Sequence, residues 1–259
     1  MSSVPKPILR ASSPDENAAG LTRVPVNPRR YDDRLLEPEE ATSIIVSMIP
    51  SGARVLDVGC AAGALVELIT NHCQADVVGV EPDPGRVAVA ISRGLNVRLG
   101  TLEPSLISKI GVFDIVLFSD VLEHLPNPQA VLLLARDALK PGGSVVVSVP
   151  NVAHWSVRLE ILQGHFRYQE SGIMDATHLK WFTRSTATSL LESSGFRVID
   201  YRVSLGAGLP DNVNHQPMSW LSDNNRVRLL RWGCRHWPTL FGAQHIFKAE
   251  MLTRLPCPK

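Results

Sequence analysis

Short, largely apolar runs alternate with helical patterns along this chain. The runs lie at residues 54–58, 76–80, 96–100, 112–118 and 144–149. Apolar runs of this kind are typical of strands that are buried on both faces of a parallel sheet. Helices are expected between them at about 64–73, at 84–93 and from 128 onward, with Asp83 and Asn127 as caps before a proline. The alternation predicts an α/β fold with a doubly wound, mostly parallel sheet.

Two more strands are expected at 196–201 and 245–251, which makes the sheet seven-stranded. Two segments, at about 151–184 and 205–241, are longer than the alternation of strands and helices needs. Ligands of open α/β sheets bind at the carboxyl ends of the strands, near which both segments emerge, so we expect these insertions to cover a substrate. Residues 31–259 are expected to form one domain. The proline-containing stretch 1–30 has no hydrophobic period and is expected to be a flexible arm.

A glycine turn follows the first strand. The sequence Asp57-x-Gly59-x-x-x-Gly63 separates this strand from the helix that begins at Ala64. Glycines leave no Cβ in the way of a ligand that approaches the backbone. Glu81 ends the next strand, where its carboxylate could accept hydrogen bonds from both hydroxyls of a ribose. The pattern predicts a nucleoside site. It differs from the G-x-G-x-x-G turn of dinucleotide sites, and the chain has no G-K-[ST] loop.

The strand, the glycine turn, the helix and the terminal acid together resemble the S-adenosylmethionine site of class I methyltransferases. A second block strengthens the resemblance: Phe113 to Val116, then Asp120 to Leu125, then Leu139 to Gly143 before an apolar strand. The family usually has a third glycine where Ala61 stands. The resemblance implies a Rossmann-like sheet with an antiparallel last strand. It also implies S-adenosyl-L-methionine as the cofactor and S-adenosyl-L-homocysteine as its product.

The resemblance also assigns residues to the cofactor. They are Asp57, Gly59, Cys60, Ala61, Gly63, Glu81, Pro82, Thr101, Leu102, Ser119 and Asp120. Thr101 stands where the family often has an aspartate facing the adenine amine, and Leu102 could pack on the adenine ring. In the family a helix like the one expected at 31–49 lies across the cofactor. Tyr31 or Arg34 could therefore touch the cofactor's carboxylate, or both could be plain surface residues.

Composition and charge narrow the function. The 259 residues are 44% hydrophobic and 20% charged, as in ordinary globular proteins, and the net charge of +1 gives no electrostatic support for binding DNA or RNA. The four cysteines are scattered and form no C-x-x-C motif, so neither a disulfide framework nor a zinc site is indicated. No run approaches the ~18 apolar residues of a membrane span, and no signal peptide is seen. We expect a soluble, cytoplasmic protein.

Polar residues that could carry chemistry follow the fourth strand and recur in the first insertion. Asp120, Glu123 and His124 would share one face of a helical turn, and His178 comes much later, before Trp181 and Phe182. This pattern resembles the metal site of two magnesium-type branches of the superfamily. The branches are the ubiquinone-pathway O-methyltransferases and the small-RNA 3′-end 2′-O-methyltransferases. Under that resemblance a divalent metal would be bound by Asp120, Glu123, His124 and His178.

A metal-free mechanism is the alternative, and the sequence favours it, because the same motif is common in metal-free members of the superfamily. Methyl transfer from a sulfonium needs alignment of the reactants and removal of the acceptor's proton. His178 would be the general base, with Asp175 one turn away to orient it and His124 helping to shape the pocket. His154, Trp155 and Arg158 are candidates for contact with the substrate, and Trp155 could equally pack within a lid.

The second insertion contains a basic amphipathic helix near 226–237. Its apolar stripe is Val227, Leu230, Cys234 and Trp237, and Arg228, Arg231 and Arg235 are displaced by one residue. Such a helix can lie on a membrane or bind an acidic substrate. The favoured interpretation is a helix packed on the domain with a solvated arginine face.

The sequence therefore predicts an S-adenosylmethionine-dependent methyltransferase that acts on a small or medium-sized acceptor, with oxygen as the favoured accepting atom. A metal-dependent RNA-end 2′-O-methyltransferase is one rival, disfavoured because no basic RNA-binding module accompanies the motif. A catalytically silent methyltransferase fold that regulates a partner is another. The intact glycine turn and Glu81 argue against the silent fold.

Overall fold

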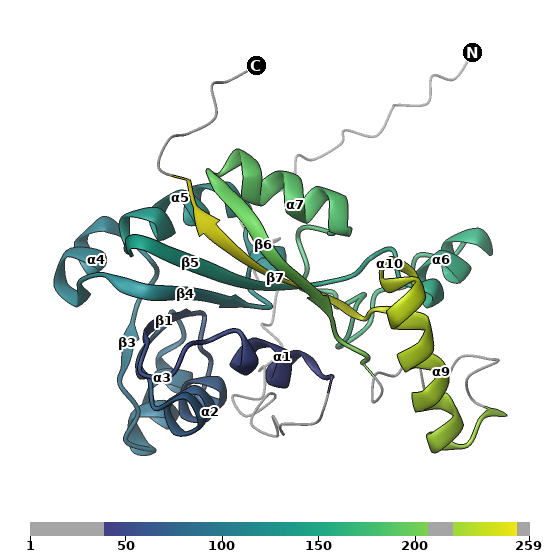
Figure 1. Ribbon diagram of the computed structural model, residues 1–259, viewed down its shortest axis with the longest axis horizontal. Helices are drawn as coiled ribbons and strands as arrows, with labels where there is room; N and C mark the ends of the chain where they lie inside the picture. The colour runs from purple at the N-terminus through teal and green to yellow at the C-terminus, as the bar shows by residue number, and fades with distance from the viewer. Residues whose placement is uncertain (1–38, 207–219, 253–259) are drawn as a thin grey trace, which may run out of the picture.

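A seven-stranded sheet runs through the part of the chain that the computed structural model describes, residues 39–206 and 220–252 (Figure 1). The strands are β1 (Arg54–Val58), β2 (Asp76–Glu81), β3 (Val97–Leu99), β4 (Phe113–Ser119), β5 (Leu139–Pro150), β6 (Phe196–Val203) and β7 (Gln244–Met251). Their order is β3-β2-β1-β4-β5-β7-β6. The pairs from β3 to β5 are parallel, and β7 runs antiparallel to both β5 and β6. The predicted Rossmann-like sheet with its antiparallel last strand is confirmed.

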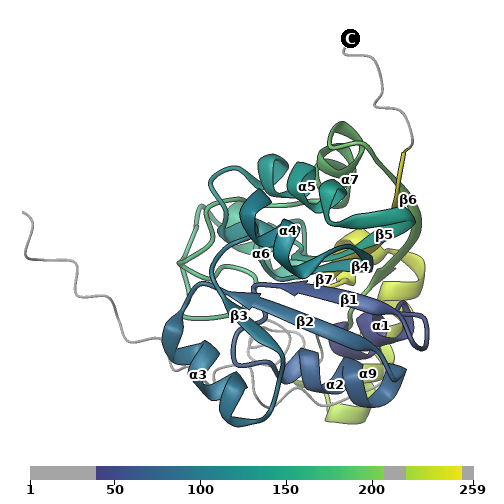
Figure 2. The same ribbon diagram turned by 90° about the vertical axis from the view of Figure 1, so that its left-hand side faces the viewer.

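Helices cover both faces of the sheet, as Figure 2 shows. The helices are α1 (Ala41–Ser47), α2 (Ala64–Cys73), α3 (Pro84–Ser92), α4 (Pro104–Ile110), α5 (Pro128–Asp137), α6 (Trp155–Leu162), α7 (Arg184–Ser193), α9 (Asp223–His236) and α10 (Pro238–Phe241). The 3-10 helix η1 (Leu122–His124) follows β4. One apolar core lies between the sheet and α4, α5 and α7, and the other between the sheet and α1, α2 and α3.

The buried strands explain this three-layer arrangement. Along β4, Val116 and Phe118 enter the first core, whereas Ile115 and Leu117 enter the second. Successive side chains of a strand point to opposite faces, so a continuously apolar run can only be satisfied by helices on both sides. The apolar run at 112–118 therefore predicts helices on both faces of the sheet as well as a buried strand.

Some boundaries differ from the expectation. Strand β5 begins at Leu139, so the segment 140–143 belongs to the strand rather than to a turn before it. Leu139 pairs with Phe113, and Lys140 Nζ lies 2.9 Å from the carboxylate of Asp114, which holds the segment against β4 across a shift in register. Helices α4 and α6 were not predicted. The arm 1–30 and the start of the expected 31–49 helix, with Tyr31 and Arg34, lie outside the described residues.

Both insertions lie beyond the carboxyl end of the parallel strands (Figure 1). The first carries α6, and the second carries α9 and α10. Leu205, Leu230 and Trp155 share one small apolar cluster, so the two insertions pack on each other. Leu230 is fully buried, as the apolar stripe predicted, but Trp237 follows the end of α9 and is 51% exposed. No helix in residues 39–206 or 220–252 combines the length and apolar character that crossing a bilayer requires.

A buried histidine makes the fold sensitive to acid. His245 on β7 is fully buried, its Nδ1 lies 2.9 Å from the hydroxyl oxygen of Tyr201, and burial with the charge of Arg184 lowers its pKa to about 4. Its pKa in the unfolded chain is about 6.5, so below that pH the unfolded state binds a proton that the folded state refuses. Stability from this residue is therefore present above about pH 6.5 and is lost as the pH falls toward 4.

We expect His245 alone to lower the free energy of unfolding by about 2 kcal/mol between pH 7 and pH 5. Urea denaturation at both pH values would measure the change in wild type and in His245→Gln, which has no such proton. The matched control is His72→Gln on the outer face of α2. A pH-dependent loss of the same size in wild type and His245→Gln would contradict the assignment.

Candidate active site

The glycine turn between β1 and α2 adopts backbone conformations that require small residues. Gly59, Ala61 and Gly63 have φ of 74°, 51° and 85°. A Cβ on Gly59 would lie 2.8 Å from a methyl of Val121, and one on Gly63 would lie 2.4 Å from a methyl of Leu95. The left-handed φ at Ala61 explains why the family usually has glycine there, since this region costs other residues about 1–2 kcal/mol.

Glu81 is held beside this turn at the end of β2. The N–H of Ala61 donates to Oε2 of Glu81 (2.9 Å), and the N–H of Asp83 donates to Oε1 (3.1 Å). Each carboxylate oxygen can accept a second hydrogen bond, so capacity for two hydroxyl donors is left. Arg86 on α3 places Nη1 3.8 Å from Oε1, an ion pair that the sequence did not suggest. The role of Glu81 as a ribose acceptor stays a prediction.

The other predicted cofactor residues surround the same edge of the sheet. Pro82 and Thr101 are exposed, whereas Asp57, Leu102 and Ser119 are buried. Burial, followed by the charges of Asp57 and Glu81, raises the pKa of the Cys60 thiol, so this cysteine stays protonated and packs against Gly79. Asp120 has the left-handed φ of 56°, an unusual conformation for a residue with a side chain.

A cavity of about 260 Å³ opens next to this edge. Its lining brings together four acids from three separate places in the chain, Glu40, Asp120 with Glu123, and Asp175, and the two imidazoles of His124 and His178. None of the described residues that line it is a lysine or an arginine. The described lining of the cavity is therefore acidic.

Glu123 is the most unusual of these residues. Its side chain is almost completely buried, at 1% exposure, and neither carboxylate oxygen has a hydrogen-bond partner among the described residues. Burial, aided by the charges of Asp120 and Asp175, raises the pKa of this carboxyl well above its usual range. Buried polar groups are nearly always paired, so a buried carboxyl without a partner indicates that another group contacts it in the working protein.

Two histidines face this carboxyl with the same tautomer. Nδ1 of His178 lies 3.1 Å from the carbonyl oxygen of Ile173, and Nδ1 of His124 lies 3.2 Å from that of Thr177. A carbonyl only accepts, so each Nδ1 carries the proton and each Nε2 keeps its lone pair. The two rings meet edge to face at 4.9 Å. Burial and the charge of His124 lower the pKa of His178, which favours its neutral form.

Backbone contacts bring His178 to this place from the first insertion. The N–H groups of Leu179 and Lys180 both donate to the carbonyl oxygen of Glu123, at 2.8 and 3.0 Å. One ligand atom each of Glu123, His124 and His178 consequently lies within 4.8 Å of the other two. The structure thus joins three of the four predicted metal ligands into one group.

Asp120 and Asp175 are held by other partners. Oδ1 of Asp120 accepts from Ser148 Oγ (3.0 Å) and from Gln244 Nε2 (2.6 Å). Oδ1 of Asp175 accepts from the N–H and the hydroxyl of Thr177, at 2.8 and 2.6 Å. The expectation that Asp175 orients His178 needs correction, because the Ile173 carbonyl holds its Nδ1. Asp175 acts on the ring through its charge, which raises the pKa of His178 against the effect of burial.

The remaining candidates have mixed outcomes. His154 and Trp155 begin α6, His154 is fully buried, and Trp155 packs in the cluster between the insertions, as expected of lid packing. Arg158 Nε donates to the carbonyl of Ala153 (2.6 Å), a contact within its own segment. Sequence reasoning missed Gln244 and Glu40, which line the cavity. No local pattern marks either residue, although Gln244 begins a strand that was predicted.

The fold, the glycine turn and the terminal acid define a class I S-adenosylmethionine-dependent methyltransferase. The sequence matches the family described as "Methyltransferase domain" over residues 29–201, more than half of the chain. The chain therefore belongs to this methyltransferase family.

Relatives and solved structures agree. The chain is 31% identical over 160 residues to the mitochondrial ubiquinone biosynthesis O-methyltransferase of Rattus norvegicus, covering 57% of this chain and 45% of that protein. It is 33% identical over 156 residues to the ubiquinone biosynthesis O-methyltransferase of Dinoroseobacter shibae, covering 58% and 62%. The chain spans about half the length of the curated relatives it matches.

A crystal structure of a SAM dependent methyltransferase from Archaeoglobus fulgidus has a TM-score of 0.54 at 20% identity, with coverage of 81% of this chain and 94% of that chain. A crystal structure of a SAM dependent methyltransferase from Aquifex aeolicus has a TM-score of 0.54 at 14% identity, with coverage of 88% of this chain and 100% of that chain. At these identities the likeness concerns the fold alone, and it supports the predicted architecture.

Proposed function

We propose that this methyltransferase transfers the methyl group of S-adenosylmethionine to a hydroxyl oxygen of a small or medium-sized, uncharged acceptor. The observation that carries the proposal is the orphaned carboxyl of Glu123, which lies within 4.8 Å of a ring nitrogen of His124 and of His178 in a cavity beside the glycine turn. Such a group suits the removal of a proton from a weak acid. Methyl transfer to oxygen requires that step, together with alignment of donor and acceptor.

The residues fit a divalent cation, in contrast to the metal-free mechanism that the sequence favoured. Glu123, His124 and His178 would hold it, since two imidazoles and a carboxylate suit manganese, iron or zinc, and magnesium less well. The carbonyls of Thr177 and Ile173 would act as outer partners that fix both rings. When bound, the cation would lower the pKa of the acceptor hydroxyl. The chain's own part is to orient both Nε2 atoms and to keep Glu123 away from water.

The acidic lining supports a neutral acceptor. Glu123 would be neutralised by the cation, but Glu40, Asp120 and Asp175, with no lysine or arginine among the described lining residues, would disfavour an acceptor that carries several negative charges. This argues against the ribose–phosphate backbone of an RNA end. The matched relatives are named for O-methylation in ubiquinone biosynthesis, and that name supports oxygen as the accepting atom here.

The proposal is tested with the full chain and labelled cofactor. Calorimetry should show binding of S-adenosylhomocysteine, with no competition from NAD, because the turn lacks the glycine spacing of a dinucleotide site. Label from the methyl group of S-adenosylmethionine should then appear on oxygen in a panel of phenols, catechols and aliphatic diols. Label on amines of matched size, with none on hydroxyls, would contradict the choice of oxygen, and label on carboxylates alone would contradict the choice of a hydroxyl.

A further inference from the structure

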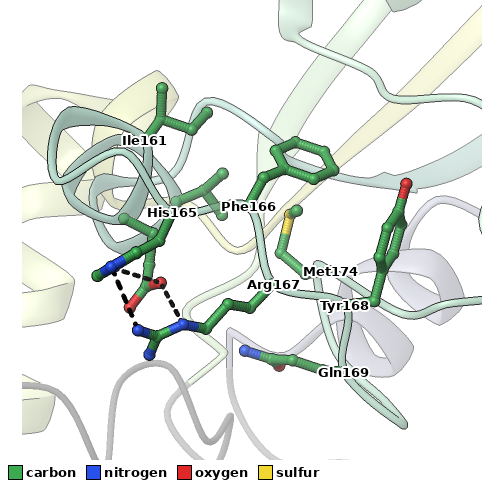
Figure 3. A pocket seen from close by; sticks show the side chains of 9 residues that line it. Ile161, His165, Phe166, Arg167, Tyr168, Gln169 and Met174 are labelled. Atoms are coloured by element: carbon green, nitrogen blue, oxygen red, sulfur yellow. Dashed lines mark hydrogen bonds and ion pairs between the residues drawn. The ribbon is translucent and has the colours of Figure 1, made fainter.

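A second cavity, of about 300 Å³, lies within the first insertion (Figure 3). Val157 and Met174, both buried, contribute apolar side chains to its lining. Phe166 and Tyr168 also line it, and Figure 3 shows their rings rising from one short segment. The two rings meet edge to face at 5.5 Å. We call this site the aryl pocket.

The aromatic residues of the aryl pocket are unusually exposed. Phe166 is 48% and Tyr168 is 61% exposed, and Ile161 beside them is 52% exposed. Large apolar side chains grouped in this way on a soluble surface mark a binding site more often than chance placement does. A hollow between them gives a ligand a place to enter, which a flat patch would not.

The aryl pocket lies next to the cavity of about 260 Å³ that contains His178, which we call the catalytic cavity. The segment 169–175 closes on itself through a bridge between Gln169 and Asp175, and Gln169 lines the aryl pocket whereas Asp175 lines the catalytic cavity. Trp181 joins the two sites through its ring, which lies 5.4 Å from that of His178 and 5.8 Å from that of Phe166. Trp181 therefore contacts both His178 and Phe166, which places the aryl pocket one ring away from His178.

The charged groups of the aryl pocket are arranged to neutralise one another. Glu160 Oε2 lies 3.9 Å from both His165 Nδ1 and Arg167 Nε, at one corner of the pocket (Figure 3). At this corner the negative charge of Glu160 and the positive charge of Arg167 lie against each other. What remains is a neutral, ring-lined hollow, and aromatic rings gain from edge-to-face or offset contact with Phe166 and Tyr168.

We propose that the aryl pocket is an acceptor subsite that holds a neutral aromatic group of the acceptor, while the hydroxyl to be methylated lies in the cavity of His178. The inference rests on the proposed function. It narrows the acceptor to molecules that carry an aromatic group in addition to the part that bears the reacting hydroxyl. It separates the two parts of the substrate: the catalytic cavity selects the hydroxyl and excludes anions, and the aryl pocket selects the ring.

Two probes that differ by one ring test this. Dissociation constants of phenol and 4-phenylphenol would be measured by ligand-observed NMR, with and without S-adenosylhomocysteine. We expect wild type to bind 4-phenylphenol about 10-fold more tightly than phenol, because the pocket removes the second ring from water. The gain is limited to this size because the ring is only partly buried. In the double variant Phe166→Ala, Tyr168→Ala the preference should fall to about twofold or less. Both residues are exposed, so their truncation leaves the fold intact.

The matched control is Leu162→Ala, which removes an 84% exposed side chain from the same segment and should keep the full preference. A wild type without preference for 4-phenylphenol, or a double variant that retains it, would overturn the proposal. So would an equal loss in Leu162→Ala, since that result indicates unspecific adsorption. Failure to bind S-adenosylhomocysteine would instead overturn the proposed function, and the probe measurement would still report on the pocket.

Discussion

Replacing Glu123 by glutamine is expected to abolish divalent-cation binding and to lower kcat by about 10²- to 10⁴-fold. The amide has the size of the carboxyl but cannot bring negative charge to the two Nε2 atoms of His124 and His178. A ligand that binds only the folded state raises the melting temperature. We therefore expect Mn²⁺ to raise the melting temperature of wild type and to leave that of Glu123→Gln unchanged. This readout does not depend on knowing the acceptor.

The same experiment distinguishes the two mechanisms. If the three residues act as one site, His178→Ala and His124→Ala lose as much activity as Glu123→Gln, because the loss of one ligand opens the site. A chelator should then remove wild-type activity and Mn²⁺ should restore it. His72→Ala, on the outer face of α2, is the matched control and should keep both responses. A different outcome would establish His178 as a base that works without a metal. In that case the wild-type enzyme would keep full activity in the chelator, and among the variants only His178→Ala would lose turnover.

The sheet could be predicted because its signals are local. A run such as 112–118 must be buried on both faces, and that requirement follows from apolar side chains a few residues apart. The glycine turn is equally local, since Gly59 and Gly63 report backbone conformation directly. The start of β5 was missed for the opposite reason. A Pro-Gly-Gly segment indicates a turn, and the contacts that hold the start of the strand against β4 come from the residues before it, Leu139 with Phe113 and Lys140 with Asp114.

The cavity around Glu123, His124 and His178 could be predicted in its residue types but not in its contacts. Glu123 and His124 lie in a recognisable motif, but nothing in the motif says that Glu123 is buried without a partner. His178 reaches them through N–H groups of Leu179 and Lys180, and backbone donors have no side-chain signature in a sequence. The same limitation explains why Asp175 was expected to orient His178, a role that the Ile173 carbonyl performs.

The aryl pocket shows a related limit. Phe166 and Tyr168 follow no helical or strand period, so the sequence offered only a covering segment for a substrate. Both rings pack against Trp181, which comes later in the chain. A short window of sequence around Phe166 and Tyr168 therefore does not show that the three rings come together. Packing between parts of an insertion is set by tertiary contacts, and those contacts decide which exposed rings form a cavity.

Replacing Glu81 by alanine is expected to weaken binding of S-adenosylhomocysteine by about 10- to 150-fold, the loss that accompanies removal of hydrogen bonds to a charged group. Two effects contribute. The ribose hydroxyls would lose their acceptor, and the N–H groups of Ala61 and Asp83, which Glu81 holds at 2.9 and 3.1 Å, would lose theirs. The second effect loosens the turn itself, where Ala61 is already in a left-handed conformation.

Glu81→Gln separates these effects. Its amide oxygen can still accept one backbone N–H, but its amide nitrogen cannot accept a hydroxyl, so binding should weaken while the turn is largely kept. Isothermal titration calorimetry would give the affinities, and chemical denaturation would report on the turn. Glu192→Ala, an exposed change on α7, is the control and should match wild type in both measurements. Unchanged affinity in Glu81→Gln and Glu81→Ala would remove Glu81 from the ribose site, whereas equal losses of stability and affinity in Glu81→Ala alone would assign it to the turn.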